Sequence, residues 1–333
     1  MKIGKWTVGL NQPAYIIAEI GMNYNGQLEL AKEHIAKAAE CGVSAVKFQT
    51  FKAENLLLSN NERFATMKAS ELPFEWHKSL AEEAAEFGLD FLSTGFGFEE
   101  LNFLDSICVP AFKIASCDLN NIPLICHAVE LGKPMIISTG YASMEEIDNS
   151  VALIKESKTP FVLLHCIASY PTEPHDMHLI NIKLLQSRYQ VLTGLSDHSI
   201  NDTTIPAAAR ALGACVFEKH FTLDRKLKGF DHGMSADPEA MSEYVKSIRE
   251  TEAALGVERC GAFESELARI ARARRGVYWK RDLKPGDVVC HEDVLIVRPS
   301  SNLVPADLKR IVGKKIRSGV SRNNPVSLEE VSD

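Results

Sequence analysis

The stretch AYIIAEIGMNYNG (14–26) decides the fold, because a short apolar run is followed directly by small and polar residues. Further runs of the same kind follow in the first two thirds of the chain. They are SAVKFQ (44–49), LDFLST (89–94), AFKIAS (111–116), PMIIST (134–139), FVLLHC (161–166), QVLTGLSD (190–197) and ACVFEKHF (214–221). Each run is too short for a helix, and its continuous apolar character is typical of a parallel strand buried on both faces.

Segments with helical spacing lie between these runs, and most of them end next to a glycine that favours helix termination. They cover residues 28–41, 74–87, 122–131, 144–155, 202–212 and 238–255. Eight strand–helix units in about 255 residues predict an α/β fold, a (β/α)8 TIM barrel. We expect the barrel to occupy residues 1–256.

The pattern changes after Gly256. A charged helical linker over residues 257–272 precedes GVYWKRDLKPGDVVCHEDVLIVRP (276–299), where Lys-Pro-Gly-Asp predicts a turn between short strands. The sequence therefore predicts a second module over residues 273–333. Because so small a module buries little apolar area, we expect it to pack against another surface.

Composition and charge exclude several classes of function. The chain has 37 basic and 44 acidic side chains, a formal net charge of −7. Since no run of five Lys or Arg occurs, we expect no nucleic-acid partner. Glu19 interrupts the first apolar run, so the sequence predicts neither a signal peptide nor a membrane span. The cysteines form no C-x-x-C pair, which favours reduced thiols in a cytoplasmic protein over a zinc knuckle.

Polar side chains gather where the predicted strands end. In a TIM barrel the active site lies at the carboxyl ends of the strands. The side chains at or just beyond these ends are Glu19, Asn23, Asn25, Lys47, Gln49, Ser93, Thr94, Lys113, Ser116, Asp118, Ser138, Thr139, His165, Cys166, Tyr170, Ser196, Asp197, His198, Glu218, Lys219 and His220. Packing does not require polar groups at eight consecutive strand ends, so the sequence predicts a ligand-binding mouth.

A metal site is predicted from His198 and His220, which end neighbouring strands. Imidazole suits zinc, manganese, iron or cobalt, and a site completed by water or substrate is catalytic in character. Two histidines are more often unrelated to a metal, but their paired placement at the mouth favours a shared ion. His165 is the competing ligand, and its position within an apolar strand favours a core histidine instead.

Lys47 and Lys113 follow apolar residues inside strands, where an ammonium group is costly unless an anion pairs with it. One interpretation is an internal salt bridge to Glu19 or Glu218. The other is capture of a phosphate or carboxylate, helped by nearby hydroxyl groups. The chain has no Walker loop and no dinucleotide fingerprint, so we expect a small anionic substrate. Asp231, in GFDHGMS (229–235), either caps its loop or contacts a sugar hydroxyl.

The ordered motifs resemble those of the sialic acid synthase family. They are AEIGMNYNG (18–26), KFQTFKAE (47–54), FLSTGF (91–96), FKIAS (112–116), LHCIASYP (164–171), GLSDHS (194–199), EKHFTLD (218–224) and GFDHGMS (229–235). The segment that begins RRGVYWKRDLKPGD resembles that family's antifreeze-like (SAF) domain. The resemblance covers nearly the whole chain. It implies condensation of phosphoenolpyruvate with an N-acylated mannosamine-type sugar, giving a nine-carbon 2-keto-3-deoxy acid and phosphate.

The resemblance also implies roles for single residues. Phosphoenolpyruvate would be held by residues matching Lys47, Thr94, Lys113, Ser116, Ser138 and Ser196, and the sugar by residues matching Gln49, Phe96, Tyr170, Asp231 and Arg298. The carboxylates matching Glu19, Asp118 and Glu218 would order the sugar hydroxyls and the attacking water, and which of them acts as general base stays open. His198 and His220 would hold a divalent metal, commonly manganese, with magnesium or cobalt as alternatives. Arg298 would reach the sugar of a partner subunit, which implies a domain-swapped homodimer.

Some residues depart from the family pattern. Tyr24 stands where the family usually has His, Gly95 where it has Pro, and Asp118 where it has Glu, and Arg298-Pro299 is followed by Ser300-Ser301. We expect these changes to affect which sugar is used, either N-acetylmannosamine or a 2,4-diacetamido-trideoxy sugar. Two alternatives remain. A related synthase making a seven- or eight-carbon keto acid would lack the C-terminal module, and a non-catalytic sugar-acid-binding barrel would have lost its metal or lysine residues.

Overall fold

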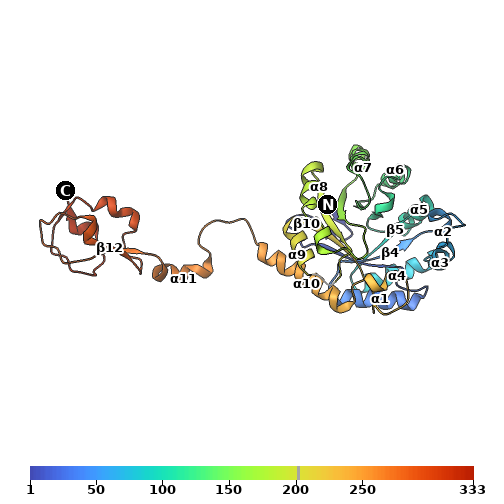
Figure 1. Ribbon diagram of the computed structural model, residues 1–333, viewed down its shortest axis with the longest axis horizontal. Helices are drawn as coiled ribbons and strands as arrows, with labels where there is room; N and C mark the ends of the chain where they lie inside the picture. Colours follow the sequence, from blue (N-terminus) through green and yellow to red (C-terminus); the bar gives the residue numbers. More distant parts are fainter. Residues whose placement is uncertain (201–202) are drawn as a thin grey trace. The chain divides into compact units, whose positions relative to one another are not determined.

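The computed structural model describes residues 1–200 and 203–333. The chain divides after Gly256 into two compact units, Met1–Gly256 and Val257–Asp333. The first unit contains the barrel and the second contains short strands and 3-10 helices (Figure 1).

Eight parallel strands close into the predicted TIM barrel. In barrel order they are β3 (Tyr15–Gly21), β4 (Ala45–Thr50), β5 (Asp90–Gly95), β6 (Phe112–Ile114), β7 (Met135–Ser138), β8 (Phe161–Cys166), β9 (Leu192–Asp197) and β10 (Ala214–His220). β10 pairs in parallel with both β9 and β3, which closes the barrel. Every predicted strand agrees with an observed one to within two residues at each end.

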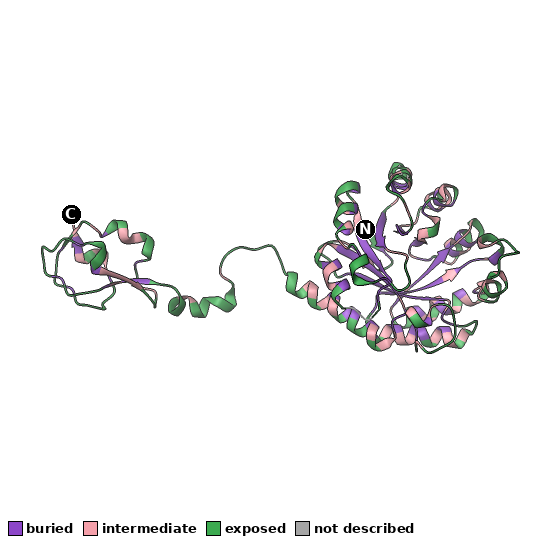
Figure 2. Ribbon diagram, viewed as in Figure 1, coloured by how far each residue is buried: buried purple, intermediate pink, exposed green. Residues whose placement is uncertain are grey.

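Helices surround the barrel and turn their exposed faces outward (Figure 2). The longer ones are α1 (Leu28–Glu40), α4 (Phe74–Glu86), α5 (Phe98–Ser106), α6 (Ile122–Leu131), α7 (Met144–Ser157), α8 (Asn181–Tyr189), α9 (Thr204–Ala211) and α10 (Pro238–Leu255). The start of α10 illustrates why they form: the Asp237 side chain accepts a hydrogen bond from the Ala240 amide, and Pro238 occupies the first helical position. No helix in the described ranges is both long and apolar enough to span a bilayer.

The sequence analysis missed several of these elements. It did not identify α5, α8, the short helices α2 (Ala53–Leu56) and α3 (Phe64–Ala69), or the amino-terminal hairpin of β1 (Lys2–Ile3) and β2 (Trp6–Thr7). The helix predicted over residues 202–212 is observed from Thr204 onward, and Asp202 lies outside the described residues. α6 and α10 have the predicted bounds.

The inside of the barrel consists of two layers of different character. The lower layer is apolar and fully buried, and its members are Ile17, Ala45, Leu92, Ala111, Ile136, Leu164 and Val216, together with Gly194 of β9, which has no side chain. Side chains two residues apart on a strand face the same way. The upper layer therefore consists of the residues two positions further along the strands, namely Glu19, Lys47, Thr94, Lys113, Ser138, Cys166, Ser196 and Glu218. All of these are buried, and most are polar or charged.

The second unit has a small core of its own. After α11 (Glu264–Ala273), β11 (Gly276–Trp279) pairs with β12 (Val294–Val297), and β13 (Lys315–Ile316) pairs with β14 (Val331–Ser332). Trp279 is fully buried in this core together with Val277 and Ile311. The predicted turn is present, since the Lys284 amide donates to the Asp287 carboxylate across it.

Candidate active site

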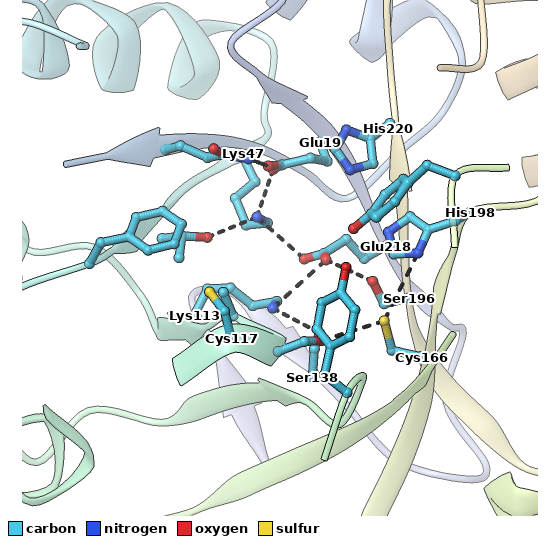
Figure 3. Close-up of a pocket in the computed structure, with 17 residues that line it drawn as sticks. Glu19, Lys47, Lys113, Cys117, Ser138, Cys166, Ser196, His198, Glu218 and His220 are labelled. Atoms are coloured by element: carbon cyan, nitrogen blue, oxygen red, sulfur yellow. Dashed lines mark hydrogen bonds and ion pairs between the residues drawn. The ribbon is translucent and has the colours of Figure 1, made fainter. Parts of the chain in front are cut away.

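A cavity opens at the carboxyl ends of the barrel strands, above the upper layer (Figure 3). We call it the inner cavity. Most residues predicted for the site line it, namely Glu19, Lys47, Gln49, Thr94, Phe96, Lys113, Ser116, Ser138, Tyr170, Ser196, His198, Glu218 and His220. Cys166, which the sequence placed at the mouth without a specific role, lines it too, and so do Ala115, Cys117 and Tyr141, which the sequence did not single out. These groups come from all eight strands or from the loops that follow them, so they lie together because the barrel is closed.

Two buried lysines dominate the floor of the inner cavity (Figure 3). Lys47 Nζ lies 2.7 Å from Glu19 Oε2 and 3.5 Å from Glu218 Oε2, and it donates to Thr94 Oγ1 at 3.0 Å. Lys113 Nζ donates to Ser138 Oγ at 2.8 Å and lies 3.8 Å from Glu218 Oε1. The predicted internal salt bridges to Glu19 and Glu218 are therefore present, and the same two ammonium groups also face a cavity that can admit an anion.

The charges in this cluster are strongly coupled. Burial opposes ionisation of Glu218, but the neighbouring Lys113 and Lys47 cations together lower its pKa to about 2. Burial lowers the pKa of Lys113, whereas the carboxylates of Glu19 and Glu218 outweigh burial at Lys47 and raise its pKa. Burial of charges is expensive unless a specific partner compensates it. Concentrated charge of this kind is typical of a catalytic or binding site rather than of a packing layer.

His198 and His220 lie beside each other on the cavity wall, with ring centroids 5.6 Å apart. His198 Nδ1 is 2.9 Å from the Ile167 carbonyl, so it donates there and leaves Nε2 free to bind an ion. His220 Nδ1 is buried without a hydrogen-bond partner and lies 3.7 Å from Asp231 Oδ2. Burial lowers the pKa of His220 to about 4, which keeps the imidazole in its neutral, metal-binding form.

The donor set fits a metal that keeps open positions. Within residues 1–200 and 203–333, no three His, Cys, Asp or Glu side chains are arranged to hold an ion. The two imidazoles would therefore share the ion with water or substrate oxygens, as catalytic sites do. Tyr170 covers this pair, with its ring 4.1 Å from that of His198 and 6.1 Å from that of His220.

A second, wider cavity adjoins the inner one, and we call it the outer chamber. It shares Gln49, Tyr170 and His220 with the inner cavity, and its further lining residues are Met22, Arg63, Phe230, Asp231, Gly233 and Met234. Its volume is about 650 Å³, compared with about 190 Å³ for the inner cavity. The combination of polar groups with apolar side chains suits a sugar that carries acyl or methyl groups.

Asp118 and His165, two strand-end residues of the first unit, line neither cavity. Asp118 lines neither cavity, because the residue falls in a 3-10 turn after β6 and its Oδ1 accepts a hydrogen bond from Asn121 Nδ2 at 3.1 Å. Arg298 belongs to the second unit. His165 lies at the outer side of β8, where Nε2 is 2.7 Å from the Met177 carbonyl oxygen.

Two departures from the family pattern are explained by packing rather than by sugar contact. Tyr24 is buried, packs against Phe48 and donates its hydroxyl to the Ser70 carbonyl. At Gly95, a Cβ would lie 2.9 Å from Leu101 Cδ2, so the leucine side chains of α5 would have to shift to admit a side chain here. Neither residue lines the inner cavity or the outer chamber.

Several lining residues carried weak sequence signals. Cys166 ends β8 and could have been assigned from its position, whereas Tyr141 lies just beyond Ser138-Thr139-Gly140 with a positive φ of 62°. Arg63 precedes α3 in a segment without apolar periodicity, so nothing in its neighbourhood pointed to the cavity. Only the folded loop between β4 and α4 brings it to the outer chamber.

Comparison with known proteins gives matches along almost the whole chain. The NeuB family model matches residues 34–259, and the SAF domain model matches residues 274–332. The N,N'-diacetyllegionaminic acid synthase of Legionella pneumophila is 36% identical, covering 97% of this chain and 96% of the relative. The pseudaminic acid synthase of Campylobacter jejuni strain 81-176 is 33% identical, with 95% of each chain covered.

A solved structure has the same architecture. The N-acetylneuraminic acid (sialic acid) synthetase of Leptospira borgpetersenii, crystallised in complex with citrate, is 37% identical to this chain. The match has a TM-score of 0.77 and covers 81% of this chain and 94% of the other.

Proposed function

Because the chain belongs to the NeuB family and is a synthase, a transferase that forms carbon–carbon bonds, we propose that it condenses phosphoenolpyruvate with an N-acylated mannosamine-type sugar. The product would be a nine-carbon 2-keto-3-deoxy acid of the sialic type, released together with phosphate. The observation that carries this proposal is the pair of buried lysines facing a small cavity, Lys47 and Lys113.

Phosphoenolpyruvate fits the inner cavity in charge and in size. Its phosphate and carboxylate groups would face the two lysines, and the hydroxyl groups of Thr94, Ser138 and Ser196 would donate to its oxygens. Thr94 and Ser138 already bond the lysines at 3.0 and 2.8 Å, so the site is pre-organised for an anion.

The sugar would occupy the outer chamber with its aldehyde directed to the inner cavity. Gln49, Tyr170 and His220 lie at the junction of the two cavities, where the aldehyde would meet the enol carbon. Asp231 would accept hydrogen bonds from sugar hydroxyls. Phe230 and Met234 would contact the methyl part of an acyl group.

A divalent metal, with manganese as the first choice and magnesium or cobalt as alternatives, would be held by His198 and His220. Their imidazoles lie side by side, and His220 Nδ1 lacks a hydrogen-bond partner. When bound, such an ion supplies Lewis acidity toward the sugar carbonyl.

The reaction forms one bond between C3 of phosphoenolpyruvate and the aldehyde carbon. Water adds to the cationic C2 that results, and its two protons go to the oxygen of the former aldehyde and to the departing phosphate. The C–O bond to phosphate then breaks, so that phosphate carries away the bridging oxygen and C2 becomes a ketone. Lys47 and Lys113 would stabilise the negative charge that develops on the departing phosphate. Glu19 and Glu218 are the candidate general bases, because both carboxylates line the inner cavity and Asp118 does not.

We also propose a domain-swapped homodimer in which Arg298 of one subunit serves the sugar site of the other. The proposal rests on the family resemblance. Arg298→Ala protein mixed with inactive His220→Ala protein should regain part of the activity after subunit exchange. No recovery in proven heterodimers would overturn it.

The experiment that tests the reaction measures phosphate release and product mass. Phosphoenolpyruvate and Mn²⁺ are supplied with N-acetylmannosamine or with either 2,4-diacetamido-trideoxy sugar that leads to legionaminic or pseudaminic acid. We expect turnover of one sugar with the mass of the condensation product, and none without sugar or with Lys47→Met protein. Phosphate release that does not depend on sugar, or no binding of phosphoenolpyruvate, would contradict the proposal.

A further inference from the structure

An ion pair outside the cavity connects the two strands that carry the histidines. Lys219 Nζ lies 3.2 Å from Asp197 Oδ2, and the two side chains are 5% and 0% exposed. Their backbones are direct partners in the parallel ladder between β9 and β10. Since neighbouring residues on a strand face opposite sides, this pair lies on the helix-facing side while Ser196 and Glu218 face the cavity.

The same pair holds the backbone around His198. The Ser199 amide donates to Asp197 Oδ1 at 2.8 Å, and Lys219 Nζ donates to the Ser199 carbonyl at 2.7 Å. The Thr172 amide donates to the His198 carbonyl at 3.0 Å. The amide and the carbonyl of Ser199 are thus both hydrogen-bonded to the ion pair. These bonds restrict the backbone next to His198 and so the direction in which its side chain points.

Lys219 also immediately precedes His220. Its ammonium group is fixed by Asp197 and by the Ser199 carbonyl, and it lies 5.1 Å from the centroid of the Tyr244 ring of α10. A shift of β10 relative to β9 would break these contacts. The pair therefore couples the position of one histidine to that of the other.

Fold stability alone does not account for such a pair. Replacing a buried ion pair by apolar side chains of similar volume is often neutral or stabilising, so a barrel has no need of one here. Apolar side chains could not bond the Ser199 peptide groups. We propose that Asp197 and Lys219 are positioning residues that fix the separation of His198 and His220 and thereby set the affinity for the divalent metal. This inference rests on the metal site of the proposed function.

The test compares Mn²⁺ affinity, measured by equilibrium dialysis, between wild-type protein and the double variant Asp197→Asn, Lys219→Met. The double variant leaves no unpaired buried charge, so we expect it to fold. Its dissociation constant for Mn²⁺ should rise about 10- to 100-fold, the effect typical of residues that orient metal ligands. Binding of phosphoenolpyruvate in the absence of metal should stay unchanged, because the pair does not line the inner cavity.

A matched control is the buried ion pair of Arg210 and Glu252. Arg210 Nε lies 3.1 Å from Glu252 Oε1, with side chains 7% and 16% exposed. Arg210 also donates to the Ala214 carbonyl at the start of β10, at the opposite end of that strand from His220. The double variant Arg210→Met, Glu252→Gln should change thermal stability and leave Mn²⁺ affinity as in wild type.

The outcomes separate this inference from the proposed function. If wild-type protein binds Mn²⁺ and the folded Asp197, Lys219 double variant binds it equally well, the inference is wrong. If wild-type protein binds no Mn²⁺, or if His198→Ala protein binds it as wild type does, the metal part of the proposed function fails. Should the double variant not fold, Lys219→Arg keeps a cation opposite Asp197 but displaces the donor that bonds the Ser199 carbonyl. Unchanged Mn²⁺ affinity of that folded single variant would also overturn the inference.

Discussion

The two layers inside the barrel differ in chemistry although they are separated by only two residues along each strand. Ile17, Ala45 and Ala111 fill the lower layer, whereas Glu19, Lys47 and Lys113 occupy the same strands one step higher. The lower layer contains only apolar side chains that pack against one another. The upper layer buries charges, which cost stability unless they are paired. Position along the strand therefore separates the two tasks of the barrel: the lower layer stabilises the fold, and the upper layer binds the ligand.

The largest effect is expected in the upper layer. Lys113→Met removes a cation from the inner cavity and should lower kcat/KM about 10²- to 10³-fold, the loss typical of one charge-stabilising group. Its melting temperature should fall as well, because Glu218 loses the cation that lies 3.8 Å away, so kcat/KM is measured on the folded fraction. Lys133→Met is a suitable control, since Lys133 pairs with Asp105 at 3.1 Å outside the cavity. A kcat/KM equal to that of wild type in Lys113→Met protein would show that the upper layer does not take part in the reaction.

The lower layer should respond in the opposite way. Leu92→Ala removes a fully buried side chain two residues before Thr94 and should reduce the free energy of unfolding by about 2–5 kcal/mol. The folded fraction should keep the kcat/KM of wild type. Denaturant titration and active-site-normalised kinetics measure the two quantities. Loss of kcat/KM at unchanged stability would contradict the division into layers.

The sequence predicted the barrel well because parallel strands buried on both faces leave uninterrupted apolar runs, as in 161–166. It located the upper layer because a charged residue such as Lys113 conflicts with such a run. It could not predict Arg63, whose place depends on the path of a loop, or the hydrogen bond that Asp118 accepts from Asn121. It also missed α5 and α8, which are short helices of nine residues each. Side-chain partners such as Asp197 and Lys219 follow from strand register, which the sequence alone does not specify.

A change in the outer chamber should have a smaller effect on activity and should affect the sugar but not phosphoenolpyruvate. Arg63 carries a full positive charge at the outer chamber and does not line the inner cavity. Arg63→Ala should raise KM for the sugar about 10- to 100-fold, since a hydrogen bond from a charged group to the sugar would contribute about 1.5–3 kcal/mol. KM for phosphoenolpyruvate should stay unchanged. Equal increases in both constants would show that the two cavities do not act separately.

The smallest effect concerns buried titratable groups that lie outside both cavities. Burial lowers the pKa of His77 to about 4, and its Nε2 lies 2.7 Å from Thr50 Oγ1. The folded protein therefore binds a proton here less readily than the unfolded chain does. The contribution of neutral His77 to the free energy of unfolding is complete above the unfolded pKa of about 6.5. It is lost as the pH falls from there toward 4.

His77→Gln should accordingly weaken the fall of melting temperature between pH 7 and pH 5, by an amount equivalent to about 2 kcal/mol. Thermal unfolding at both pH values, for the variant and for wild type, measures the difference. Identical pH dependence of the two proteins would show that His77 does not contribute.

We propose that the upper layer binds phosphoenolpyruvate and that the lower layer only supports the upper layer. Calorimetric titration of phosphoenolpyruvate into wild-type, Lys113→Met and Leu92→Ala protein, without metal or sugar and at a temperature where all are folded, tests it most directly. We predict saturable binding to wild type and to Leu92→Ala protein with similar dissociation constants, and at least tenfold weaker binding to Lys113→Met protein. Equal binding to all three proteins would contradict the claim.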